Sequence, residues 1–149
     1  MIDPRLAPLC ISTHDLVKRS GWEAGPWDDE PDRVEWTDPR SGLGCLVNRA
    51  PAGHLCGYVR VPSGHPWHGL DYGSVRPHPD VHGGLTFSDE FDRLSVAGYW
   101  LGFDCAHLGD RIILDRQSID PDDRYRDFAY VMDECADLAA AVQAAAVAS

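Results

Sequence analysis

A stretch rich in proline and glycine, residues 62–80, most limits the folds open to this chain. It holds four prolines, three glycines and three histidines. Proline lacks a backbone N–H and fixes φ, so neither a helix nor a central strand can run through most of this length. We therefore expect a long surface loop. Loops of this kind are often functional, and Trp67 and Tyr72 give it aromatic side chains with which to lie over a pocket.

Strand and turn patterns lie on both sides of this loop. Before it, turn residues separate three strand-like runs, and after it come two further runs with aromatic and β-branched residues. The five expected strands are residues 33–37, 43–48, 55–61, 81–87 and 96–104. Because the connections between most of them are short, an antiparallel sheet of about five strands is the favoured arrangement.

The C-terminal region has the apolar pattern of an amphipathic helix. Its apolar residues recur at steps of three and four, at Tyr125, Phe128, Val131, Met132, Cys135, Leu138, Ala139 and Val142. Residues 120–123 supply a cap, a proline for the first turn and acids that suit the helix dipole. We expect this helix to pack on one face of the sheet, which gives an α+β fold. A short capped helix is also expected at residues 12–18, ended by Gly21.

The length and charge limit the classes of protein. A chain of 149 residues fits a single domain, residues 1–149, with one core. The formal net charge of −11 repels phosphate backbones, so general nucleic-acid binding is not expected. The acids gather in loops and not along a regular stripe, which disfavours imitation of DNA. The oligomeric state stays open.

Signals for export and for redox chemistry are not evident. Residues 1–5 do not resemble a signal peptide, and no window has the apolar length of a membrane span. We therefore expect a cytoplasmic protein without membrane contact. The five cysteines lie in apolar surroundings with no Cys-x-x-Cys pair, and they are expected to be reduced core residues.

Two motifs stand out in the second half of the chain: residues 80–87, DVHGGLTF, and residues 102–110, GFDCAHLGD. With residues 56–59, 64–66 and 125–126, they resemble an uncharacterised family of small proteins encoded by bacteriophages and bacteria. The resemblance covers roughly residues 33–140. It implies no established activity or ligand. It does imply a phage-related setting, in which small accessory proteins often act against host defence.

In the first motif, His82 is followed by a glycine pair. Gly83 and Gly84 can adopt positive φ and let a ligand oxygen approach N–H groups beside the imidazole. A phosphate site can be built in this way without lysine. The alternative is a β-bulge, in which His82 only bonds a neighbouring strand.

The second motif places Asp104, His107 and Asp110 at three-residue steps after an apolar strand. Ionisable groups at strand ends often form sites. Asp104 can orient the His107 ring and hold its tautomer. The alternative is a polar turn in which Asp104 and Asp110 accept backbone N–H groups.

The two histidines together suggest acid–base chemistry. If their strands are neighbours, His82 and His107 face one pocket within about 8 Å and can serve as base and acid in phosphodiester cleavage. Thr86 is a further catalytic candidate. The pattern is only an analogue of the two-histidine phosphoesterases, because Thr86 lies four residues after His82 and no hydroxyl follows His107 at their spacing.

The same atoms suit a second chemistry. His82, Asp104, His107 and Asp110 are of the types that bind zinc or manganese, but their spacing matches no recognised metal signature. We therefore expect no cofactor, and a metal ion at these four residues stays an alternative.

The ligand-binding surface is expected to join the motifs to the long loop, because bases stack on aromatic and histidine side chains. Its candidates are Gly83, Gly84, His65, Trp67, Tyr72 and Asp110. Taken singly, His54, His68 and His78 are more typical of surface residues.

Kinases, dinucleotide-dependent oxidoreductases, serine hydrolases and zincins are disfavoured. The chain has no P-loop, no Rossmann glycine motif, no Gly-x-Ser-x-Gly and no His-Glu-x-x-His. Three classes remain: a histidine-dependent phosphodiesterase or other hydrolase, a protein that sequesters a nucleotide signal, and an inhibitor acting through a protein interface. The leading hypothesis is recognition of a small nucleotide-derived or phosphorylated molecule, in phage counter-defence, with cleavage or sequestration as the outcome.

Overall fold

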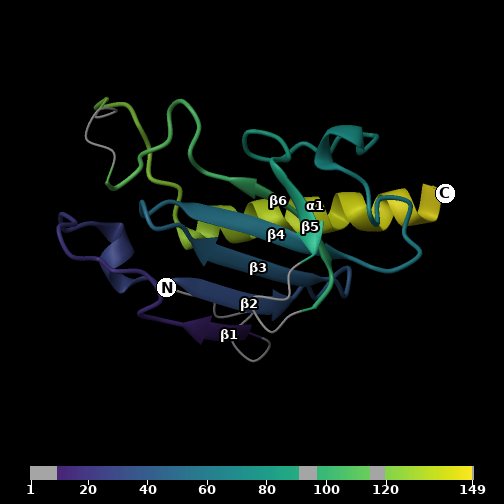
Figure 1. The fold of residues 1–149 in the computed structure, drawn as a ribbon, viewed down its shortest axis with the longest axis horizontal. Coiled ribbons are helices and arrows are strands. Elements are labelled where there is room, and N and C mark those ends of the chain that lie inside the picture. Colours follow the sequence, from purple (N-terminus) through teal and green to yellow (C-terminus); the bar gives the residue numbers. More distant parts are fainter. Residues whose placement is uncertain (1–9, 91–96, 115–119, 149) are drawn as a thin grey trace.

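The computed structural model describes residues 10–90, 97–114 and 120–148, in which six strands form one antiparallel sheet. Their order in the sheet is β1-β2-β3-β4-β6-β5, and the helix α1 crosses one face of it (Figure 1). The elements are β1 (Cys10–Thr13), β2 (Arg33–Thr37), β3 (Gly44–Arg49), β4 (Leu55–Val61), β5 (Phe87–Glu90), β6 (Tyr99–Asp104) and α1 (Phe128–Ala148). The expected α+β fold, with the C-terminal helix on one face of an antiparallel sheet, is confirmed.

The core lies between the sheet and α1. On β4, every second residue is buried, and Gly57 is one of these residues. A Cβ on Gly57 would lie 2.5 Å from the Phe103 ring and 2.8 Å from Cys135 Sγ, so glycine lets β6 and α1 close onto β4. The α1 side chains in this core are Phe128, Val131, Met132, Cys135, Leu138, Ala139 and Val142. This is the apolar face that the sequence predicts except for Tyr125, which precedes the helix.

The start of α1 differs from the prediction. Residues 120–123 do not cap the helix; Asp127 does, because its Oδ1 accepts the Tyr130 N–H at 2.9 Å. Arg124 exchanges backbone hydrogen bonds with residues 109 and 111. These bonds hold the segment before Asp127 against the motif that contains Asp110.

The expected helix at residues 12–18 is wrong. Cys10–Thr13 forms β1 instead and pairs with β2, which makes six strands where about five were expected. The chain then turns at Asp15, whose φ is 63°, and the Asp32 carboxylate accepts the N–H groups of Leu16 and Val17, both at 2.9 Å. Such side-chain bonds replace those that a helix would make within its own backbone.

A buried ion network fixes this N-terminal part to the sheet. The Arg49 side chain is fully buried, with its Nε 3.1 Å from Asp32 Oδ1 and its Nη2 3.3 Å from Glu30 Oε1. Its Nη1 donates to Tyr125 Oη at 2.8 Å. Because each charge has a partner, the network joins β3, the segment before β2 and the approach to α1.

The strand expected at residues 81–87 is also wrong over most of its length, because β5 begins at Phe87. Gly83 and Gly84 have φ values of 67° and 78°, and the Gly84 N–H donates to the Val81 carbonyl at 2.8 Å. The segment is therefore a tight turn, as positive φ at glycine allows. The strand expected at residues 96–104 is present as β6 from Tyr99 to Asp104, and residue 96 lies outside the described residues.

The proline-rich loop packs on the core. Trp67 is buried, with its Nε1 donating to the Arg76 carbonyl at 3.1 Å. His65 is buried as well, with its Nε2 2.6 Å from the Val142 carbonyl oxygen of α1. Neither side chain is exposed for stacking on a ligand in this structure, so a ligand-binding role of His65 and Trp67 would need the loop to move and stays a prediction. Tyr72, in a short 3-10 helix (Tyr72–Ser74), stays partly exposed. Among the described residues, no helix is long and apolar enough to cross a membrane.

Candidate functional site: a cluster of histidines and carboxylates

The carboxylate of Asp110 is the centre of the candidate site. Its Oδ2 accepts the His107 N–H at 2.9 Å and lies 2.8 Å from His82 Nε2, while its Oδ1 accepts Arg126 Nε–H at 3.0 Å. Burial by itself raises the pKa of Asp110, but these hydrogen bonds outweigh it and hold the pKa below its ordinary value. Asp110 is therefore ionised and ties two segments and the approach to α1 together.

His82 is engaged through both ring nitrogens. Its Nε2 faces Asp110, and its Nδ1 lies 2.7 Å from the Tyr130 hydroxyl of α1. The Tyr130 hydroxyl in turn lies 3.4 Å from Glu134 Oε1. The His82 side chain is only 13% exposed. Without a rearrangement, neither nitrogen of His82 is available to a ligand.

Of the two motif histidines, His107 is the more accessible, with 34% of its side chain exposed. Its Nε2 is buried, 3.2 Å from Asp104 Oδ1, at an angle that does not make a hydrogen bond. Asp104 is itself fixed, because its carboxylate accepts the Thr86 hydroxyl at 2.9 Å and the Ala106 N–H at 3.1 Å. The other ring nitrogen, Nδ1, has no partner in the described residues and is not buried.

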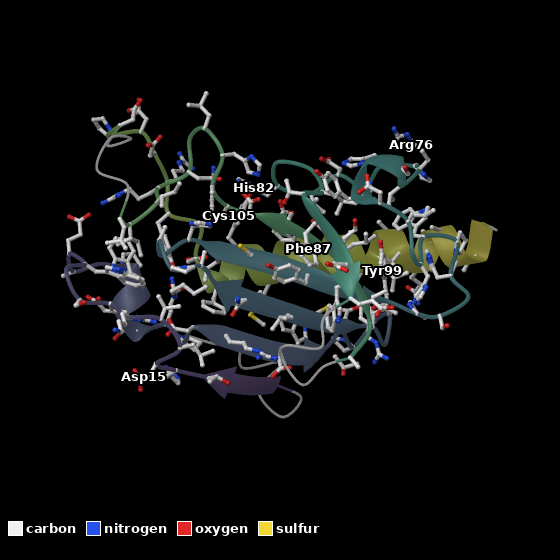
Figure 2. All side chains as sticks on the ribbon, in the orientation of Figure 1. Asp15, Arg76, His82, Phe87, Tyr99 and Cys105 are labelled. Carbon is white, nitrogen blue, oxygen red and sulfur yellow. The ribbon has the colours of Figure 1, made fainter. Side chains whose placement is uncertain are left out.

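The two imidazole rings lie 5.9 Å apart, within the distance that the sequence predicts. They are not on paired strands, however: His82 precedes β5 and His107 follows β6, and antiparallel pairing brings these two ends together. Figure 2 labels His82 and Cys105, the residue that follows β6. The structure thus brings together His82, Gly83, Asp104, His107 and Asp110, with Thr86 attached through Asp104.

Other residues at the cluster were missed from sequence. Arg126 lies two residues before α1 and Tyr130 lies in its first turn, so the four-residue spacing within a helix could not have signalled their contact. Burial lowers the pKa of His54, against the opposing negative charges of Asp104 and Asp110 nearby. His78 Nε2 lies 3.4 Å from the Leu85 N–H, next to Gly84.

Thiol and metal chemistry find little support here. Burial raises the pKa of Cys105 far above its ordinary value, and that of Cys56 to about 11, so neither thiol is an activated nucleophile. Among the residues that the structure describes, no group of three or more histidine, cysteine, aspartate or glutamate side chains is arranged to hold a metal ion. His82, Asp104, His107 and Asp110 instead bond one another and their neighbours.

A pocket of about 550 Å³ lies elsewhere, between the β2–β3 turn and α1. Its lining includes Trp36, Asp38, Arg40, Asp133 and Asp137, and no residue of the histidine cluster. A pocket of this volume is large enough for a small ligand. The cluster has the chemical groups, so we place the candidate site there.

Comparison with known proteins gave no match to a family model, to a curated protein or to a solved structure. The resemblance to small phage and bacterial proteins therefore stays a prediction.

Proposed function

We propose that the protein binds a small phosphorylated or nucleotide-derived molecule at the histidine cluster and hydrolyses it with His107 as the acid–base group. The observation that carries this proposal is the setting of His107. One face of its ring is held between Asp104 and Gly83, while Nδ1 stays open. Asp104 lies 3.2 Å from Nε2 without a hydrogen bond, and a small rotation of the ring would let the carboxylate accept the Nε2 proton. An imidazole whose one N–H is accepted by a carboxylate, with the other nitrogen free, is the usual form of a general base.

The reaction needs only one free imidazole. Neutral His107 takes a proton from a water molecule as the water oxygen forms a bond to phosphorus. The bond from phosphorus to the leaving oxygen breaks, and the imidazolium returns its proton to that oxygen. Asp104 stabilises the imidazolium between these steps, and Thr86 keeps Asp104 in place through its hydroxyl.

The turn at Gly83 and Gly84 supplies a place for phosphoryl oxygens. The Gly83 N–H has no hydrogen-bond acceptor in the described residues, and the residue is exposed beside the His107 ring. A backbone N–H in this position can meet an oxyanion without a competing side chain.

Sequestration of the same ligand is the second candidate. It is favoured by the engagement of both His82 nitrogens, which leaves His82 unable to act as an independent acid. An interface inhibitor is the third candidate, and the observation in its favour is Leu108, which is fully exposed next to His107. The proposed setting for all three is the cytoplasm of a host cell, in phage counter-defence, as the resemblance implies.

The test is incubation of the protein with a panel of cyclic and linear nucleotides, followed by mass analysis of the nucleotides and of what heat releases from the protein. A changed nucleotide mass supports hydrolysis, and an unchanged nucleotide released by heat supports sequestration. His107→Gln is the informative variant. His14→Gln is its matched control, because His14 is an exposed histidine next to β1, at the opposite edge of the sheet from β5. If no nucleotide is changed or retained, the proposal fails.

A further inference from the structure

We infer that Arg126 is the residue that recognises the ligand's phosphate, through the two terminal nitrogens of its guanidinium group. This inference rests on the proposed function. It names the group of the ligand that is recognised and the residue that recognises it.

Arg126 is already held in place without a ligand. Its Nε donates to Asp110 Oδ1 at 3.0 Å, and its guanidinium carbon lies over the Tyr130 ring, 5.0 Å from the ring centroid. A phosphate that binds here does not have to immobilise a free side chain, which is the main cost of binding with a long flexible residue.

The terminal nitrogens of Arg126 stay open, although the side chain is only 24% exposed. In the described part of the chain, neither Nη1 nor Nη2 makes a hydrogen bond. Arg111 is a useful contrast, because its two terminal nitrogens bond the Ile112 carbonyl and the Glu23 carboxylate. A guanidinium fixed at Nε with free terminal N–H groups has the geometry that holds phosphate by two parallel hydrogen bonds.

The guanidinium of Arg126 is also linked, through Asp110, to the segment that carries His107. Asp110 bonds Arg126 with one oxygen, and His82 and the His107 N–H with the other. A phosphate on Arg126 would therefore lie next to the segment that carries His107. The negative charge of Asp110 opposes an anion, and the positive charge of Arg126, which pairs with it at 3.0 Å, offsets that charge.

The probe is inorganic phosphate, added to the intact protein at constant ionic strength and followed by heteronuclear NMR. Wild type should show saturable shifts of the Arg126 Nε–H and His107 ring signals. Arg126→Gln should weaken phosphate binding roughly tenfold or more. Arg126→Lys should give intermediate binding, since lysine keeps the charge but not the fork. Arg124→Gln is the matched control, because the exposed Arg124 contacts Asp110 only through backbone pairing, and it should bind as wild type does.

Two results would overturn the inference while leaving the proposed function intact. One is a folded Arg126→Gln, or Arg126→Lys if the first variant melts early, that binds phosphate as tightly as wild type with shifts at His107. The other is an equal loss of phosphate affinity in Arg124→Gln and Arg126→Gln. It would mean that the total positive charge, and not the two terminal nitrogens of Arg126, attracts phosphate. If wild type shows no saturable shift at either residue, the phosphate site and the proposed ligand class fail together.

Discussion

Gly83 lies against the His107 ring so closely that a Cβ at position 83 would be 2.2 Å from His107 Nε2. Gly83 also has a φ of 67°, a region that other residues enter at a cost. The glycine is therefore required twice, by the turn before β5 and by the position of the imidazole.

Gly83→Ala should lower the free energy of unfolding by roughly 1–3 kcal/mol and displace the His107 ring. Gly84→Ala is the matched control, since Gly84 has a φ of 78° but a Cβ there would be 3.4 Å from His78 Nε2. Urea unfolding gives the stabilities, and the His107 ring signals in NMR spectra report the displacement. Equal effects of the two substitutions on those signals would contradict the close contact.

Asp110 should make stability depend on pH in the acid range. Its folded-state pKa lies below the ordinary value of 3.8, so its stabilisation is complete above that value and is lost as the pH falls through the folded-state pKa. Asp110→Asn should cost roughly 1–3 kcal/mol at neutral pH and should flatten the acid limb of the stability profile. Urea unfolding at a series of pH values measures both effects, and a variant with an unchanged acid limb would exclude Asp110 as their source.

Trp67 and Tyr72 should contribute very different amounts to the stability of the fold. Trp67→Ala removes a buried ring and should cost about 3–5 kcal/mol of unfolding free energy. Tyr72→Ala removes a partly exposed ring and should cost less than about 1 kcal/mol. Thermal melts without ligand decide the matter, and similar melting of both variants would contradict the different burial of the two rings.

Much of the fold follows from local patterns. The strands from Arg33 to Val61 and the apolar face of α1 were predictable, because alternation and helical periodicity are properties of neighbouring residues. The strand β1 was not, because its partner β2 is distant in sequence and a helix pattern competes over the same residues. The start of α1 was misplaced for a similar reason, since the Phe128 N–H is accepted by Glu30, 98 residues away.

The candidate site was predictable in part. The nearness of His82 and His107 follows from the pairing of consecutive strands, although the rings stand in the turns beyond those strands. The engagement of His82 by Tyr130, 48 residues away, and of Asp110 by Arg126 depends on how α1 packs on the sheet. Tertiary packing decides which of the two imidazoles stays accessible, and no local pattern reports it.

Turnover in water enriched in heavy oxygen tests the central claim most directly. The nucleotide panel is incubated in that water with wild type, His107→Gln and His14→Gln, and the products are weighed by mass spectrometry. If His107 activates water, the product that wild type and His14→Gln form carries one heavy oxygen on phosphorus. His107→Gln should form that product at least about a hundredfold more slowly. Labelled product formed by His107→Gln at the wild-type rate, or no labelled product from wild type, would contradict the account.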